Sequence, residues 1–173
     1  MTPYYSQHLD VVATEWQSRA CGVVCLKMLL EARGIATPSL DEMIKQGDAI
    51  GAHGPSGWIH DGLVALAHQY GAKLSRTEWR MSDTKTPDEL NEEGIAFLVA
   101  LLRAHRPVMV SAIKKFREEN KFHMVVLVEL KEESGAVAGF HYHDPDSKTK
   151  SEGENQFVSF DVFRTVWRRM AIF

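Results

Sequence analysis

The chain has 173 residues, of which 45% are hydrophobic and 25% charged, and its formal net charge is −3. This length and composition allow a full hydrophobic core, and we expect one domain over residues 1–173. The slightly acidic balance disfavours binding to nucleic acid or to a membrane surface through positive charge. No apolar run reaches the ~20 residues of a membrane span. The N-terminus lacks a signal-peptide pattern, so we expect a cytoplasmic protein (secreted only if a signal segment was removed).

The first cysteine stands where a buried helix is expected to begin. Apolar residues recur at helical spacing from Cys21 onward, and Gly34 is expected to end this helix. A helix N-terminus carries partial positive charge, which favours the nucleophilic thiolate over the thiol. Gly22 follows and leaves room for a close approach to the sulfur. Cys21 is therefore a candidate nucleophile, whereas Cys25, one turn deeper, is interpreted as a core residue.

The remaining pattern predicts helices first and strands afterwards. Further helices are expected after the Ser39–Glu42 capping pattern, after Trp58 and from Pro87 to Ala104, with a Gly/His/Pro-rich loop at 51–57. The expected strands are 73–79, 107–113, 123–130, 137–143, 156–160 and 168–173, with a helical turn at 161–167. This order indicates an α+β fold with a mostly antiparallel sheet.

A cysteine nucleophile needs a base and a group that orients the base. The strands at 123–130 and 137–143 are expected to form a hairpin joined by residues 131–136. If Leu130 opposes Val137, then His123 opposes Asp144, and directly opposed side chains lie ~5 Å apart. This register is an assumption, because a slip of one residue would separate the pair. It makes His123 the candidate base and Asp144 its orienting carboxylate.

Other chemistries fit the sequence less well. His141 and His143, two positions apart on a strand, point to one sheet face as a pair of zinc ligands would, yet no second cluster of ligands accompanies them. The segment from Asp144 to Ser147 begins like a calcium loop, but Lys148 and Thr149 follow where a ligand and a glycine are needed. The sequence lacks the Gly-x-Ser-x-Gly pattern that would indicate a serine hydrolase. We therefore expect no metal site.

Several short motifs, in this order, resemble the bacteriocin-processing (double-glycine leader) peptidases and their stand-alone relatives. They cover about residues 3 to 160 and are listed here as they stand in the sequence: Pro3-Tyr4-Tyr5-Ser6-Gln7, Ala20-Cys21-Gly22, Gly57-Trp58, Arg106-Pro107-Val108-Met109-Val110-Ser111, Phe122-His123-Met124-Val125-Val126-Leu127-Val128 and His143-Asp144-Pro145-Asp146.

The resemblance implies a papain-like fold with a Cys/His/Asp triad and a glutamine in the oxyanion hole. By position, Cys21 would be the nucleophile, His123 the base and acid, and Asp144 the orienting residue. Two departures stand out: Met124 follows the histidine where the family often has an aromatic residue, and Gln7 lies farther from Cys21 than the family glutamine does. Gln17 is closer in sequence, but it lies on the approach to the helix, and we expect Gln7 to be the oxyanion donor.

The expected function is that of a cysteine peptidase or amide hydrolase acting on a peptide or protein, with no cofactor. A papain-like acyltransferase would use the same triad, with an amine or thiol replacing water. A catalytically silent relative that binds a peptide in the same cleft is the alternative outside the enzymes. No transporter or ATPase segment accompanies the motifs, and the sequence indicates neither the substrate nor the oligomeric state.

Overall fold

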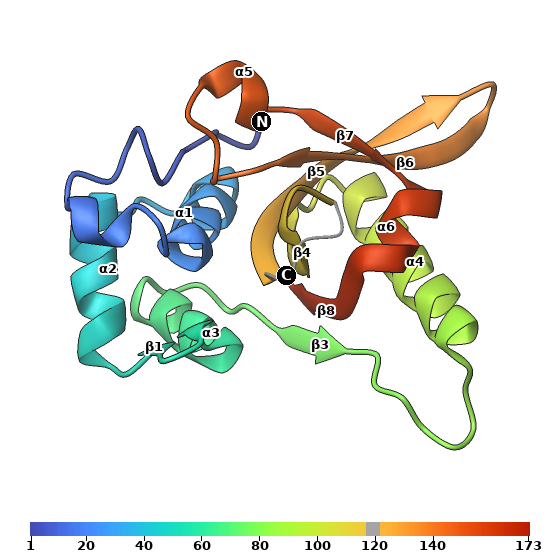
Figure 1. Cartoon of the computed structure of the whole chain (residues 1–173), viewed down its shortest axis with the longest axis horizontal. Coiled ribbons are helices and arrows are strands. Elements are labelled where there is room, and N and C mark those ends of the chain that lie inside the picture. The colour runs from blue at the N-terminus through green and yellow to red at the C-terminus, as the bar shows by residue number, and fades with distance from the viewer. Residues whose placement is uncertain (117–121) are drawn as a thin grey trace.

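A computed structural model describes residues 1–116 and 122–173 (Figure 1). The elements in chain order are η1 (Thr14–Trp16), α1 (Cys21–Ala32), α2 (Leu40–Ala49), β1 (His53–Gly54), β2 (Gly57–Trp58), α3 (His60–Gln69), β3 (Arg76–Glu78), α4 (Pro87–Arg103), β4 (Val108–Ile113), η2 (Lys114–Phe116), β5 (Phe122–Glu133), β6 (Ala136–His143), α5 (Lys150–Gly153), β7 (Gln156–Ser159), α6 (Phe160–Val166) and β8 (Trp167–Ile172).

The sheet separates two groups of helices. Its strand order is β3-β8-β4-β5-β6-β7, and every neighbouring pair is antiparallel. In Figure 1, α1, α2 and α3 lie to one side of the sheet, and α4 and α6 lie to the other. The small β1–β2 ribbon forms a separate two-stranded sheet. Helices before strands and antiparallel pairing confirm the predicted α+β fold.

Strand β5 explains why both faces of the sheet are covered. Met124 and Val126 pack into the core that α1, α2 and α3 form. Val125 and Leu127 point the other way, into the core shared with α4 and α6. Successive side chains of a strand alternate between faces, so an unbroken apolar run needs a cover on each side. Strand β5 therefore contributes side chains to the cores on both faces of the sheet.

Helix α1 is the most deeply buried helix beside the sheet. Its residues from Gly22 to Leu30 are buried, and it packs against β5. The helix ends as predicted, because Gly34 adopts a left-handed φ of 74° and the Ile35 N–H bonds the Leu30 carbonyl at 3.1 Å. At the other end Ala20 supplies no capping side chain, so the first-turn N–H groups are left for other partners.

Most predicted elements are present within one to three residues of the expected bounds. Ser39 caps α2 by accepting from the Glu42 N–H, and a full capping box with Thr86 and Glu89 opens α4. The loop at 51–57 instead contains β1 and the start of β2, and η1, η2 and α5 were not predicted. All of these are short, and short segments carry too few residues to show a period.

The predicted register of the β5–β6 hairpin is wrong. Leu130 pairs with Phe140 rather than Val137, and Val126 pairs with His143. The cause is the turn: Ser134 and Gly135 both have positive φ, 52° and 83°, and form a two-residue connection instead of the expected six-residue one. Bulges along the pair then shift the register again.

Candidate active site

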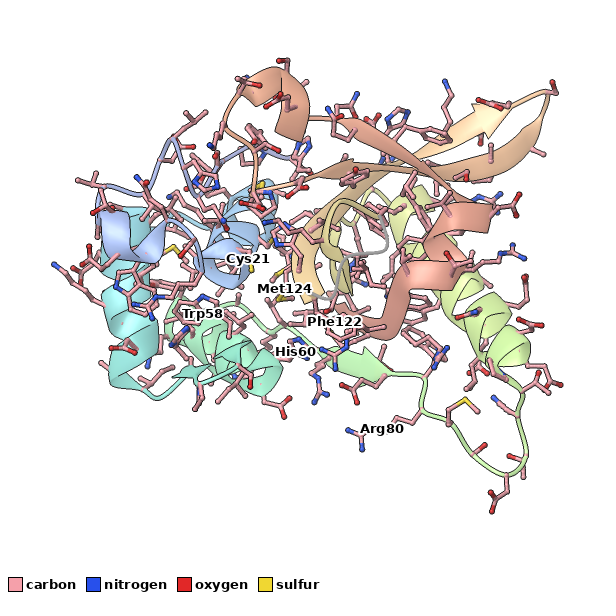
Figure 2. All side chains as sticks on the ribbon, in the orientation of Figure 1. Cys21, Trp58, His60, Arg80, Phe122 and Met124 are labelled. Carbon is pink, nitrogen blue, oxygen red and sulfur yellow. The ribbon has the colours of Figure 1, made fainter. Side chains whose placement is uncertain are left out.

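Cys21, His123 and Asp144 meet at the junction between α1 and the sheet. Cys21 is the first residue of α1, His123 lies at the start of β5, and Asp144 directly follows β6. The Nε2 atom of His123 lies 2.6 Å from Oδ1 of Asp144, and the Cys21 thiol hydrogen-bonds His123. Figure 2 shows Cys21 at the inner edge of the helical side, next to Met124. The expected contact between His123 and Asp144 is therefore present, although the register that suggested it is wrong.

The electrostatics of the pair favour a thiolate beside an imidazolium. Burial opposes ionisation of Cys21, but the hydrogen bond and the charge of His123, with the Met124 and Gly22 backbone, leave the pKa of its thiol lowered. Burial also opposes charge on His123, yet the bonds to Asp144 and Cys21 raise the pKa of its imidazole to about 10. Because Asp144 occupies Nε2, Nδ1 is the nitrogen left to exchange a proton with sulfur.

Cys25 has a different environment one turn farther along α1. It is fully buried, and its Sγ donates to the Met124 carbonyl at 3.3 Å. Burial, with the nearby charges of Cys21 and Asp144, raises the pKa of the Cys25 thiol well above its usual value. The interpretation of Cys25 as a core residue is confirmed.

Backbone contacts fix the position of Asp144. Its Oδ1 accepts from the Asp146 N–H at 2.8 Å, and its own N–H donates to the Gly153 carbonyl at 2.8 Å. The Tyr4 hydroxyl donates to the Asp144 carbonyl at 3.2 Å. A Cβ at Gly153 would lie 1.9 Å from the Tyr4 oxygen, so only glycine permits this contact. The carboxylate is thereby held toward His123.

Gln7 is held by a second carboxylate, Asp146. Gln7 is buried, and its Nε2 donates to Oδ1 of Asp146 at 2.8 Å. His8 Nε2 contacts the same oxygen at 2.7 Å, and Lys114 forms an ion pair with Oδ2. Burial would raise the pKa of Asp146, but the bonds from Lys114 and His8 leave it lowered. An ionised carboxylate only accepts hydrogen bonds, so it fixes the Gln7 amide with its nitrogen toward Asp146.

An amide nitrogen carries two donors, and the hydrogen bond from Gln7 Nε2 to Asp146 uses one of them. Gln7 lines the same cleft as Cys21. Gln17, by contrast, is not among the residues that line this cleft, and its Nε2 donates to the Val11 carbonyl at 2.9 Å. The geometry thus favours Gln7 over Gln17 as a donor near the thiol.

Trp58 positions the start of α1, a role that the sequence did not reveal. Its Nε1 donates to the Arg19 carbonyl at 2.8 Å, two residues before Cys21. A Cβ at Gly22 would lie 2.8 Å from both Cβ and Cγ of Trp58. The space beside Gly22 is therefore taken by this indole, whereas the expectation concerned an approach to the Cys21 sulfur. The Gly57-Trp58 motif could have signalled it. Asp146 stood in the last family motif and in the calcium-like segment, without a role assigned to it.

A cleft of about 830 Å³ opens over the thiol. We call it the Cys21 cleft; Gln7, Cys21, Trp58, His60 and Phe122 are among the residues that line it. Its size lies within the range of pockets that bury a drug-sized ligand. Figure 2 shows Trp58 on the helical side of Met124, Phe122 on the sheet side and His60 below Met124.

Of the two histidines considered as metal ligands, His143 has other partners, whereas Nδ1 of His141 is buried without a hydrogen-bond partner in the described residues. The Nε2 atom of His143 lies 3.2 Å from the Thr2 carbonyl, and its Nδ1 accepts from the Asn155 N–H at 3.0 Å. Across residues 1–116 and 122–173, no group of three or more His, Cys, Asp or Glu side chains is placed to hold a metal ion. Over the same residues, no helix has the length and apolar character needed to cross a bilayer.

The fold is shared with solved C39 peptidases. A protein described as a C39-like peptidase from Bacillus anthracis has a TM-score of 0.67 at 17% identity, over 99% of this chain and 92% of that one. The peptidase domain of Streptococcus ComA, a bi-functional ABC transporter involved in a quorum-sensing pathway, gives 0.62 at 17%, over 90% of each chain. A double glycine motif protease from an AMS/PCAT transporter, solved with its leader peptide, has a TM-score of 0.55 at 16% identity, over 88% of this chain and 81% of that one.

These similarities define the class: the chain has the papain-like α+β fold of the C39 cysteine peptidases. The model of the Peptidase C39-like family matches residues 2–171, and the chain belongs to that family. The resemblance inferred from the short motifs is confirmed. No curated protein matches the chain.

Proposed function

We propose that the protein is a cysteine peptidase that cleaves a peptide or protein bond, with Cys21 as nucleophile, His123 as base and acid, and Asp144 as the orienting residue. One observation carries the proposal most strongly: the Cys21 thiol bonds a histidine that Asp144 holds at 2.6 Å, at a helix N-terminus facing a cleft. Family membership supports the reaction class, and the proposed unit is a single peptidase domain over residues 1–173.

In the first half of the reaction, the Cys21 thiolate attacks the carbonyl carbon of the scissile bond. The carbonyl oxygen becomes an oxyanion, for which the Cys21 backbone N–H and the free N–H of Gln7 are the proposed donors. The intermediate collapses when the C–N bond breaks, and the His123 imidazolium gives its proton to the leaving amine. The products are an acyl-thioester on Cys21 and a neutral imidazole.

In the second half, water replaces the amine. His123 takes a proton from the water, which attacks the thioester carbonyl, and the same donors stabilise the new oxyanion. Collapse releases the carboxylic acid product and restores the thiolate–imidazolium pair. If an amine or thiol attacks instead of water, the protein acts as an acyltransferase with the same residues.

A peptide substrate is proposed because the chain belongs to a peptidase-like family and because a structural neighbour was solved with its leader peptide. The test is digestion of a peptide library, with products read by mass spectrometry, for the wild type, Cys21→Ala and the matched control Cys25→Ala. We expect new peptide termini with the wild type and with Cys25→Ala, and none with Cys21→Ala. Products with an added amine would indicate transfer. Cleavage that persists in Cys21→Ala would overturn the proposal.

A further inference from the structure

A second cavity, of about 230 Å³, shares part of its wall with the Cys21 cleft. We call it the arginine cavity; Arg80, Arg168 and Arg169 line it together with His60 and Glu78. His60 and Arg168 line both spaces. In Figure 2, His60 lies between Trp58 and the sheet, and Arg80 lies farther along the same side of the molecule. The two spaces therefore adjoin at His60 and Arg168.

An irregularity in β8 brings two consecutive arginines to this cavity. Neighbouring side chains of a regular strand point to opposite faces, yet Arg168 and Arg169 both line the same space. In the pairing with β4, Val110 opposes Ala171 and Ala112 opposes Trp167. Between these two pairs β4 has one residue, Ser111, and β8 has three, residues 168–170. Arg169 has a φ of 52°, a left-handed conformation that is strained for a side chain of this size. Such bulges re-aim side chains and are frequent beside functional sites.

The acidic group of the cavity is already engaged. Glu78 pairs with Arg76 and with Arg80, whose Nε lies 2.7 Å from Oε2. Positive charge therefore exceeds negative charge around the cavity. His60 reports this excess: burial and the neighbouring charges of Arg76 and Arg168 lower the pKa of its imidazole.

Arg168 and Arg169 still have donors to offer. Within the described parts of the chain, neither has a carboxylate within ion-pair distance. The Nε atom of Arg169 is buried without a hydrogen-bond partner. The Arg168 guanidinium lies 4.1 Å over the Phe122 ring, a contact that does not use the N–H groups at its edge. A buried, unpaired guanidinium donor is costly unless a ligand satisfies it.

We propose that the arginine cavity binds a carboxylate of the peptide that occupies the Cys21 cleft, with Arg168 and Arg169 as the donors. The peptide itself rests on the proposed function. A guanidinium presents its N–H groups in a planar fork that matches the two oxygens of a carboxylate. The carboxylate belongs either to a Glu or Asp side chain or to the C-terminus of the peptide.

The test measures binding, so that it does not depend on turnover. Cys21→Ala protein is titrated against fluorescein-labelled hexapeptide pools in which one position is fixed as Glu or as Gln, with C-termini either free or amidated. Fluorescence anisotropy gives the affinities. We expect the carboxylate-bearing pools to bind about tenfold more tightly at one fixed position or at a free C-terminus. Added NaCl should reduce this preference. The Glu/Gln arm identifies a side chain, and the acid/amide arm identifies the terminus.

Arginine variants assign the preference to the cavity. In the same Cys21→Ala background, the double variant Arg168→Gln/Arg169→Gln should abolish the carboxylate preference. If circular dichroism shows that the double variant does not fold, Arg168→Gln alone should reduce the preference. Lys45→Gln with Lys73→Gln removes the same charge from exposed positions outside the cavity, and should leave the preference intact.

The outcomes separate the two proposals. No carboxylate preference, or a preference that survives the arginine variants or is lost equally in the lysine control, overturns the carboxylate site. Failure of the wild type to cleave any peptide overturns the proposed peptidase activity and leaves this binding result standing by itself.

Discussion

Cys21 and Cys25 lie one helical turn apart on α1, in surroundings that act on their thiols in opposite directions. The pKa of Cys21 is lowered by His123 despite burial, and the pKa of Cys25 is raised by burial. We expect iodoacetamide at mildly acidic pH to label Cys21 and leave Cys25 unmodified, because the thiolate is the reacting form. Peptide mapping of the labelled native protein measures this. Preferential labelling of Cys25, or of neither cysteine, would contradict the assignment.

The same pair is expected to set the pH dependence of the proposed activity. Protonation of the thiolate at low pH removes the nucleophile, and loss of the imidazolium proton at high pH removes the acid that serves the leaving group. The acidic limb should therefore lie below the usual pKa of a cysteine, since that of Cys21 is lowered, and the alkaline limb near the raised pKa of His123, about 10. A kcat/KM profile measures both limbs, which belong to the coupled pair. An alkaline limb at the ordinary histidine value would be inconsistent with the bond to Asp144.

Gln7 and Asp146 are expected to act on oxyanion stabilisation alone. Acylation by p-nitrophenyl acetate passes through a tetrahedral oxyanion, whereas alkylation by iodoacetamide does not. Gln7→Ala should slow acylation by about 10²–10³-fold and leave alkylation of Cys21 unchanged. Asp146→Asn should slow it by about tenfold, because an amide can accept or donate and no longer fixes the Gln7 amide.

Two comparisons control this experiment. Gln17→Ala should have a milder effect than Gln7→Ala, since the Gln17 amide bonds the Val11 carbonyl away from the cleft. In a Gln7→Ala background, Asp146→Asn should have no further effect on acylation, as expected of a residue that acts through Gln7. A larger effect of Gln17→Ala would transfer the oxyanion role to Gln17, and additive effects would show that Asp146 acts by another route.

At the scale of elements, the contact between α1 and Trp58 sets where the thiol lies. Gly22→Ala should destabilise the protein by about 1–3 kcal/mol, because the new methyl group overlaps the base of the indole rather than a flexible end. In a Trp58→Ala background, the same change should stabilise it by up to about 1 kcal/mol, as alanine is the better helix former. Urea unfolding of the wild type, Gly22→Ala, Trp58→Ala and the double variant measures the four free energies of unfolding of this double-mutant cycle. A penalty of equal size in both backgrounds would mean that Trp58 is not its cause.

The elements also show what could be predicted from the sequence. Helix α1 and strand β5 were predictable because burial leaves a clear period or an unbroken apolar run over many residues. The register between β5 and β6 was not, since it depends on the φ values of Ser134 and Gly135 and on two later bulges. His123 nevertheless meets Asp144, because Asp144 lies beyond the end of β6, where the chain leaves the ladder.

Across the whole molecule, the site joins three distant parts of the chain. The N-terminal segment carries Gln7 and α1 carries Cys21. The sheet carries His123 on β5, and the turn after β6 carries Asp144. Gln7 is tied to that turn, since its N–H donates to the Pro145 carbonyl at 2.8 Å. The motifs indicated Cys21, His123, Asp144 and Gln7. Asp146 and Trp58 stand in two of these motifs, but their roles, and the arginine cavity, could not be predicted, because they arise from tertiary contacts that no local pattern records.

The account depends most on an acyl-enzyme at Cys21 formed with the help of His123. Intact-protein mass spectrometry after acid quenching tests this directly, with p-nitrophenyl acetate as the acyl donor and peptide mapping to locate the group. We expect one acetyl group on Cys21 of the wild type that is then lost by hydrolysis, and none on His123→Ala within the same time. Asp144→Ala should acylate at an intermediate rate, because an unoriented imidazole still accepts a proton part of the time. Acetylation at Cys25, or equal acetylation of Cys21 in His123→Ala, would contradict the account.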